Sequence, residues 1–260
     1  MDHYSVTQVK DTTRLQWIFK ERKEQDTHIV RSPSGDIDIT VIMIGIFRDH
    51  SQRCFLDFGR GKYRRGLPLA EIEFEPEVKE SLIGFHAFTG NDYVSSFYRK
   101  GKGVCWSALE KNPRFLPAFK DLGSTWELAE ETFKLLEEYV CVLYSCRKKN
   151  VNQARYYLFQ RKYRRDEKII DLSILPPCKS VLLLHAKRAN YVAKIWKSSE
   201  EPQLQTPDID IYGWKMNYEI KWLEKEFPDD IEDLLIDPAF DELETDDFGR
   251  DEESDDDEED

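Results

Sequence analysis

An almost wholly apolar run, Ile37 to Phe47, constrains the fold of this chain more than any other segment. Its sequence, IDITVIMIGIF, is rich in β-branched residues and follows the turn Ser32-Pro33-Ser34-Gly35. A strand that is apolar on both faces is typical of a parallel sheet covered by helices on both sides. The run therefore predicts a buried parallel strand, which can continue into a helix. Shorter strands are expected at residues 29–32, 54–58 and 67–72.

The pattern from residue 77 onward is typical of helices, with apolar residues recurring every three or four positions. Ser124-Thr125-Trp126-Glu127 matches a capping box, which predicts a long helix beginning there and ending near Arg147. Further helices are expected at residues 5–24, 77–88, 104–109, 114–122, 151–165 and 179–197.

These patterns predict an α/β fold class and divide the chain into four parts. Residues 1–105 are expected to form an α/β core with a parallel sheet, and residues 106–200 a helical region. Residues 201–228 are expected to form a linker with a small hairpin. Residues 229–260 form an acidic tail that is predicted to be disordered, because it cannot bury enough apolar surface to fold.

The charge of the chain is divided unevenly. Residues 229–260 contain nineteen Asp or Glu and one basic residue, Arg250, so this tail carries −18. Since the whole chain carries −13, residues 1–228 carry +5. The tail is interpreted either as a solvated segment that keeps the protein soluble, or as a nucleic-acid mimic. A mimic would shield the basic body or bind a basic partner.

The composition also excludes some classes of protein. No apolar run is long enough for a transmembrane helix, and the N-terminus lacks the pattern of a signal peptide. The expected location is therefore intracellular, without a membrane partner. The five cysteines form no Cys-x-x-Cys pair, which favours reduced, buried thiols over a zinc site.

Three aspartates are candidates for a metal site. Asp36 and Asp38 lie two residues apart, which places them on one face of a strand, and Asp92 follows a helix that ends at Gly90. Hard divalent cations prefer oxygen ligands, and two such ions can clamp the attacking and leaving oxygens of a phosphodiester. The alternative is that these aspartates only cap turns or face the solvent.

A glycine turn that leads into a helix follows Asp92. Gly101-Lys102-Gly103, with Lys100 before it, would offer free N–H groups and lysine ammonium groups to a phosphate of a nucleic-acid backbone. The alternative is a tight connection between two helices, with exposed lysines. Two smaller features were interpreted structurally: Arg161–Arg165 as a solvated helix face rather than a phosphate patch or nuclear signal, and His185 as a buried, hydrogen-bonded side chain.

At these motifs the chain resembles the PIN-like and flap-endonuclease-like family, and most closely a group of animal PIN-like proteins found in transposon-like contexts. The shared patterns are R-S-P-x-x-D-x-D at Arg31–Asp38, G-F/L-H-A/S-F-T-G-x-D at Gly84–Asp92 and H-x-x-R-A-N-Y-x-A-x-x-W at His185–Trp196. The resemblance implies a PIN-like parallel sheet and phosphodiester hydrolysis with Mg²⁺ or Mn²⁺. It also implies DNA or RNA as the partner, and it favours the nucleus over the cytoplasm.

The resemblance also implies specific ligands. Asp11, Asp36, Asp38 and Asp92 would hold the metal, with Asp36, Asp38 and Asp92 catalytic. The family's first-strand aspartate has no counterpart here, so the domain is expected to be truncated at its N-terminus and its ligand set incomplete. The rival hypothesis is a catalytically degenerate scaffold that binds nucleic acid or protein.

Overall fold

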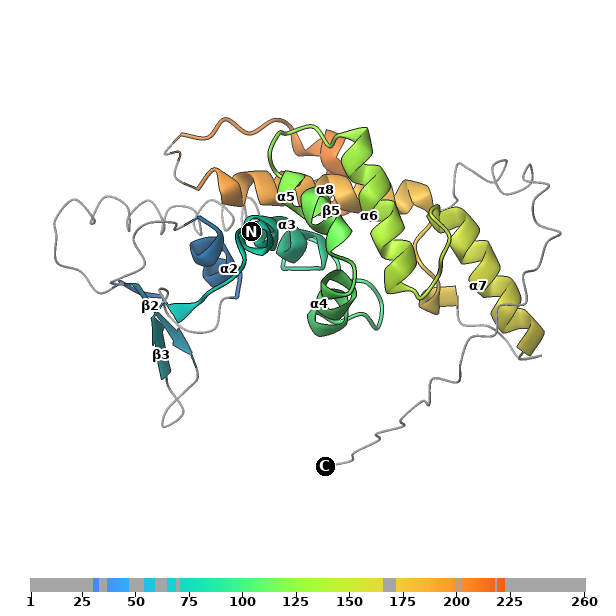
Figure 1. The fold of residues 1–260 in the computed structure, drawn as a ribbon. Coiled ribbons are helices and arrows are strands. Elements are labelled where there is room, and N and C mark those ends of the chain that lie inside the picture. Colours follow the sequence, from blue (N-terminus) through green and yellow to red (C-terminus); the bar gives the residue numbers. More distant parts are fainter. Residues whose placement is uncertain are drawn as a thin grey trace, which may run out of the picture.

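The computed structural model describes a helical body with two small β-structures (Figure 1). The described residues are 30–32, 37–46, 54–58, 65–68, 71–165, 172–199, 201, 203–217 and 219–222. The predicted helix at 5–24 and the acidic tail lie outside these residues. Within the described part of the chain, no helix has both the length and the apolar character needed to cross a membrane.

Helix α3, Pro76–Phe88, lies at the centre of the body. Every residue from Ser81 to Phe88 is buried, because α2, α5 and α8 all pack against this helix. The backbones of α3 and α5 (Leu116–Asp121) meet at Gly84, where an added Cβ would lie 2.0 Å from the Phe119 carbonyl oxygen. Only glycine therefore allows the two helices to approach this closely.

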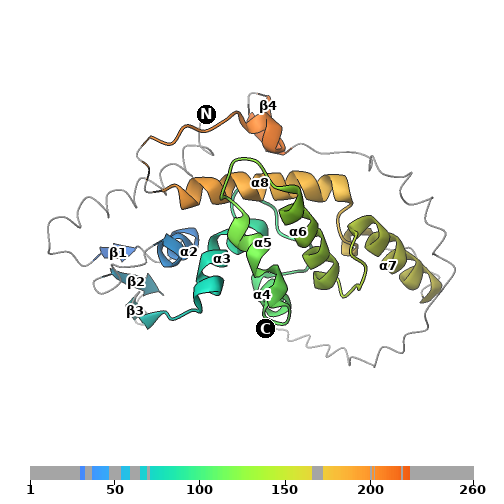
Figure 2. The same ribbon diagram turned by 45° about the horizontal axis from the view of Figure 1, so that its top comes forward.

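Helix α8, Lys179–Lys197, runs along the length of the body (Figure 2). Its Asn190 side chain accepts a hydrogen bond from the Gly123 amide at 2.8 Å and donates to the Thr125 and Trp126 carbonyls. This amide holds the loop between α5 and α6 against α8. The fully buried Trp196 completes the contact with α3.

The rest of the body is built from short helices around an aromatic core. Phe88, Phe119 and Tyr139 meet edge to face there, with ring centroids 4.9–6.3 Å apart. The remaining helical elements are α2 (Ile37–Ile46), α4 (Lys102–Glu110), η4 (Pro113–Phe115), α6 (Glu130–Leu143), α7 (Val151–Arg165), η5 (Leu172–Ile174) and η6 (Ile209–Tyr212).

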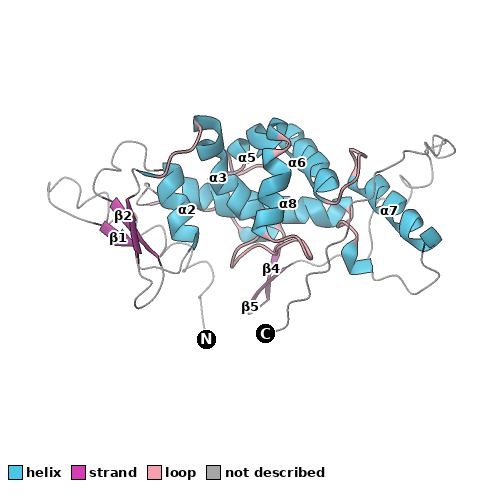
Figure 3. Cartoon of the chain, turned by 60° about the horizontal axis from the view of Figure 1, so that its bottom comes forward, coloured by secondary structure: helices cyan, strands magenta, loops and turns pink. Residues whose placement is uncertain are grey.

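The β-structure of the described residues is small and peripheral. Strands β1 (Val30–Ser32), β2 (Cys54–Phe58) and β3 (Arg65–Pro68) form one sheet, with β1 parallel and β3 antiparallel to β2. The sheet and α7 lie at opposite ends of the body (Figure 3). Strands β4 (Trp214–Asn217) and β5 (Glu219–Trp222) form the antiparallel hairpin expected near residues 213–222.

The predicted fold class, an α/β PIN-like parallel sheet, is wrong, because the described residues are mainly helical. The run predicted as the central strand is helix α2 instead. An apolar run of about ten residues has no periodicity that distinguishes a buried strand from a buried helix. Helix α2 packs its Ile39, Ile42 and Met43 against helices, and parallel pairing within the described residues is limited to three residues of β1.

The predicted capping box is also wrong. The helix begins at Glu130 rather than after Ser124, and it ends at Leu143. The hydroxyl groups of the expected cap donate to carbonyl oxygens instead, Ser124 to Lys120 and Thr125 to Glu127. The helices expected at 77–88, 151–165 and 179–197 are confirmed to within one residue at each end, as are the strands at 29–32 and 54–58.

Candidate functional site

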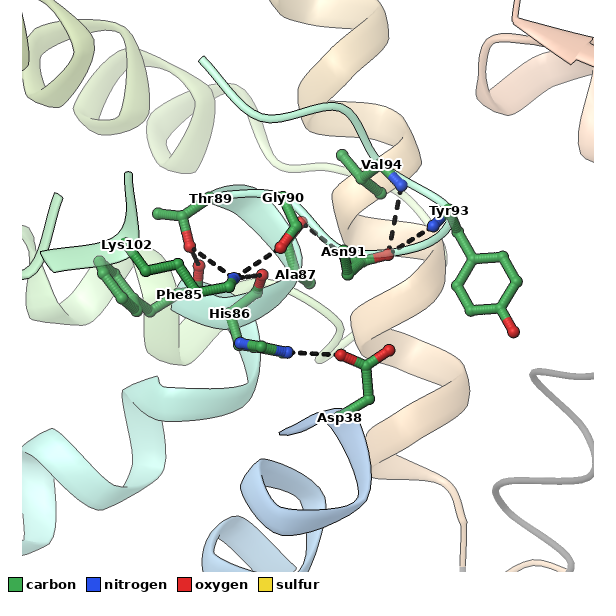
Figure 4. Close-up of polar contacts among 10 residues, drawn as sticks. All are labelled: Asp38, Phe85, His86, Ala87, Thr89, Gly90, Asn91, Tyr93, Val94 and Lys102. Atoms are coloured by element: carbon green, nitrogen blue, oxygen red, sulfur yellow. Dashed lines mark hydrogen bonds and ion pairs between the residues drawn. The ribbon is translucent and has the colours of Figure 1, made fainter. Parts of the chain in front are cut away.

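Asp38 is bonded to a histidine that sequence reasoning did not select. It lies in the first turn of α2, and its Oδ1 accepts a hydrogen bond of 2.6 Å from His86 Nε2 (Figure 4). The His86 ring is buried and lies 5.7 Å from the Trp196 ring, centroid to centroid. The contact therefore joins α2 to the junction of α3 and α8.

Asp92 is exposed, and its neighbour Asn91 builds the turn. Asn91 Oδ1 accepts from the Tyr93 and Val94 amides at 2.8 and 3.2 Å, and its Nδ2 donates to the Ala87 carbonyl (Figure 4). Gly90 precedes it at φ 112°, in the region that favours glycine. These contacts fix the chain reversal after α3 without the Asp92 carboxylate.

Lys102 closes the end of α3. Its ammonium donates to the His86 carbonyl at 3.1 Å, to Thr89 Oγ1 at 3.2 Å and to the Gly90 carbonyl at 2.5 Å (Figure 4). An ammonium group has three N–H donors, so all of them are engaged by protein oxygens. Burial lowers the pKa of Lys102 to about 8, while the nearby Asp38 carboxylate raises it.

The described residues include only part of the predicted metal site and all of the predicted phosphate site. Asp11 and Asp36 lie outside the described residues, so the four-aspartate metal site stays a prediction. Among the residues that are described, no group of three or more His, Cys, Asp or Glu side chains could hold a metal ion. Gly101 and Gly103 are exposed, and a Cβ added at either would meet no atom within 4 Å.

A second region of the body is basic, and Lys100 belongs to it. Its Nζ lies 5.2 Å from the ring centroid of Tyr144, the residue that follows the end of α6. Burial raises the pKa of Tyr144 to about 12, and the positive charge of Arg155 acts in the opposite direction. Lys100 of the α3–α4 loop therefore lies beside Tyr144, and Arg155 of α7 acts on the same tyrosine through its charge.

The charges of two further cations act on Cys146, the next buried residue after Tyr144. Burial raises the pKa of the Cys146 thiol, whereas Lys148 and Arg161 lower it through their charges. Lys148 belongs to the α6–α7 loop and Arg161 to α7. We call this region the basic surface; its members are Lys100, Arg147, Lys148, Lys149, Arg155, Arg161 and Lys162.

Helix α7 is fixed at its first turns and projects from the body at its other end (Figures 1 and 2). Asn150 Oδ1 accepts from the Asn152 and Gln153 amides, which caps the helix. Asn152 Oδ1 in turn accepts from the Lys179 amide at 2.8 Å, at the start of α8. Arg155 donates to the Pro176 carbonyl at 2.6 Å. These bonds give the cations of α7 a defined position.

The basic surface has few compensating acids. Residues 139–165 contain eight Lys or Arg and no Asp or Glu. Glu138, just before this segment, lies 3.9 Å from the Lys149 ammonium and 3.7 Å from the Arg114 guanidinium. Exposed pairs at these distances neutralise little charge. The exposed Tyr156 adds an aromatic ring to this part of α7.

His185 is structural, as predicted. It is buried between the rings of Phe88 and Phe97, with centroids 5.0 and 4.8 Å from its own. Its Nε2–H donates to the Phe88 carbonyl at 2.8 Å, so Nδ1 is the acceptor facing the Ser95 hydroxyl at 3.4 Å. Burial lowers the pKa of His185 to about 4, which keeps the ring neutral at physiological pH.

Comparison with models of protein families, with curated proteins and with solved structures gives no match to this chain. The resemblance to PIN-like nucleases therefore stays a prediction. Sequence reasoning missed the basic surface because it considered Arg161–Arg165 alone. The available signal was the absence of any acid between residues 139 and 165.

Proposed function

We propose that the protein is a nucleic-acid-binding module that contacts the phosphate backbone through the basic surface. The observation that supports this function is the charge of residues 139–165, which contain eight Lys or Arg and no acid and include the α6–α7 loop and α7, with Lys100 beside Tyr144. Lysine and arginine side chains that neutralise phosphates supply most of the affinity of sequence-independent binding. Exposed aromatic rings among them, such as Tyr156, can stack on unpaired bases.

The contacts of the predicted site support binding rather than hydrolysis. The Asp38 carboxylate bonds His86, and the Lys102 ammonium bonds three oxygens at the end of α3. Both groups therefore stabilise the fold, and each would have to give up a contact to serve a metal or a phosphate. In the basic surface Arg155 is held by the Pro176 carbonyl, whereas Lys148 and Lys162 are exposed to the solvent.

A titration of labelled single-stranded and duplex oligonucleotides tests the proposal. The double substitution Lys148→Gln with Arg161→Gln is expected to weaken binding about 10-fold at low salt, because two phosphate contacts are lost. The slope of log K against log salt concentration should decrease by about one for each lost contact. The control is Lys120→Gln with Lys194→Gln: Lys120 of α5 pairs with Glu80 at 2.6 Å, and Lys194 lies near the end of α8 that is away from α7.

The control removes the same charge but should leave most of the affinity intact. Equal weakening by the two pairs would mean that the total charge of the protein, and not the basic surface, determines binding. Absence of binding by the unsubstituted protein and by a variant with a neutral tail would refute the function itself.

A further inference from the structure

The β4–β5 hairpin, which contains the last described residues, lies against the helix that also anchors α7. Gly213, at the start of the β4–β5 hairpin, lies against α8: its carbonyl accepts from Arg188 at 2.9 Å, and its ideal Cβ would lie 3.2 Å from the Leu184 carbonyl oxygen. At the start of the same helix, the Lys179 amide donates to Asn152 of α7. Leu184 and Lys179 are five residues apart, which is about 8 Å along a helix.

The chain beyond the hairpin is long enough to reach the basic surface. Residues 223–260 follow the last described residue, Trp222. At about 3.3 Å per extended residue they can span more than about 100 Å, several times the length of α8. Even the six residues between the hairpin and Asp229 can span about 20 Å. The segment after Trp222 is therefore long enough to reach α7.

The tail and the basic surface also match in charge. The tail carries −18, and the segment 139–165 carries eight positive charges without any negative one. A tethered segment of this length has an effective concentration on the order of millimolar at a nearby site, so weak contacts suffice for occupancy. Carboxylates on a flexible chain present charges to lysine and arginine much as phosphates do.

We propose that the tail, residues 229–260, occupies the basic surface of its own chain and competes there with nucleic acid. The inference rests on the proposed function for the competition, but the contact between tail and surface can be observed separately. A nucleic acid must displace the tail, so binding is selective for ligands with enough phosphate charge. Release of the tail, by salt or by a basic partner, would open the surface.

Two experiments test the inference. The first compares the full chain with a tail-neutral variant, in which the nineteen Asp and Glu of residues 229–260 are replaced by Asn and Gln. The variant is expected to bind an oligonucleotide at least about 10-fold more tightly at 50 mM salt, with the difference disappearing near 500 mM as screening increases. Equal affinities at low salt would overturn the inference while leaving the proposed function intact.

The second experiment needs no nucleic acid. A carbodiimide joins carboxylates directly to lysine amines in contact with them, and the joined peptides are identified by mass spectrometry. Tail peptides are expected to be joined to Lys148, Lys149 and Lys162, and rarely to Lys111 or Lys120. Uniform joining to all exposed lysines would overturn the inference.

Mixing isotope-labelled and unlabelled chains separates contacts within one chain from those between copies. Crosslinked peptides that combine a labelled and an unlabelled chain can be as abundant as those from one kind of chain. This result would overturn the contact within one chain and show a contact between two copies. The expected crosslinks can form even if the tail-neutral variant binds no nucleic acid. In that case the proposed function is wrong, and the contact between tail and basic surface is right but does not compete with nucleic acid.

Discussion

Replacing Lys102 by methionine separates the two roles considered for this lysine. In the structure its ammonium bonds the His86 and Gly90 carbonyls and the Thr89 hydroxyl. Methionine has nearly the same length but no donor, so the end of α3 loses three hydrogen bonds. If the lysine bound a phosphate instead, the fold would be unaffected and nucleic-acid binding would weaken.

The expected loss can be derived from these contacts. A hydrogen bond from a charged donor contributes about 1.5–3 kcal/mol, and a carbonyl left unpaired in a half-buried position costs about 1 kcal/mol or more. The burial that lowers the pKa of Lys102 opposes these gains, because a charged ammonium is costly to desolvate. The net decrease in the free energy of unfolding is therefore expected to be about 2–3 kcal/mol.

Urea denaturation of Lys102→Met, followed by circular dichroism, measures this decrease. Lys111→Met is the matched control, since Lys111 is an exposed lysine at the other end of α4. The control is expected to change the stability by less than about 0.5 kcal/mol. A Lys102→Met protein as stable as the control, with weaker binding to an oligonucleotide, would refute the structural role and support the phosphate site.

Three further predictions concern the packing, the buried histidine and the aspartate contact. Gly84→Ala is expected to destabilise the fold by more than about 3 kcal/mol in thermal or urea unfolding, because its Cβ would overlap the Phe119 carbonyl. The control Gly103→Ala should be neutral or slightly stabilising. Equal effects of the two substitutions would contradict the close approach of α3 and α5. The pKa of His185 is about 4 in the fold against 6.5 when unfolded, so the neutral ring contributes its full stabilisation above pH 6.5 and loses it as the pH falls toward 4. Between pH 7 and pH 5 the free energy of unfolding should decrease by about 2 kcal/mol through this histidine. This decrease should be absent in His185→Gln. Asp38→Asn is expected to lower the stability by about 1–2 kcal/mol through the weakened His86 contact; loss of Mn²⁺ binding by the same variant, measured by calorimetry, would instead support the predicted metal site.

The helical half of the fold could be predicted from sequence because its signals are local. Helices α7 and α8 combine a clear three-to-four residue period with lengths of 15 and 19 residues, and their predicted bounds are confirmed. The run Ile37–Ile46 lacks such a signal, since nearly all its residues are apolar. Its conformation depends on its neighbours, which are the helices α3 and α8.

The candidate site could be predicted only in part, for a related reason. The sequence selected Asp38 as a metal ligand and Lys102 as a phosphate contact, and the charge of the Asp38 carboxylate raises the pKa of Lys102. The sequence could not show that their polar atoms bond His86 and the end of α3, because those contacts join residues 12 to 48 positions apart. The basic surface was missed for the same reason, since Lys100, Tyr144 and Arg161 are separate in sequence.

Photochemical crosslinking of an oligonucleotide to the tail-neutral variant tests the central claim most directly. A halogenated pyrimidine forms a covalent bond with an aromatic side chain that it contacts, and peptide mapping then locates the contact. The account predicts adducts on Tyr156 and its neighbours in α7, next to the basic surface. Adducts confined to Tyr93 or Tyr98, beside Asp92 and Gly101, would contradict it and place the nucleic acid at the turn after α3.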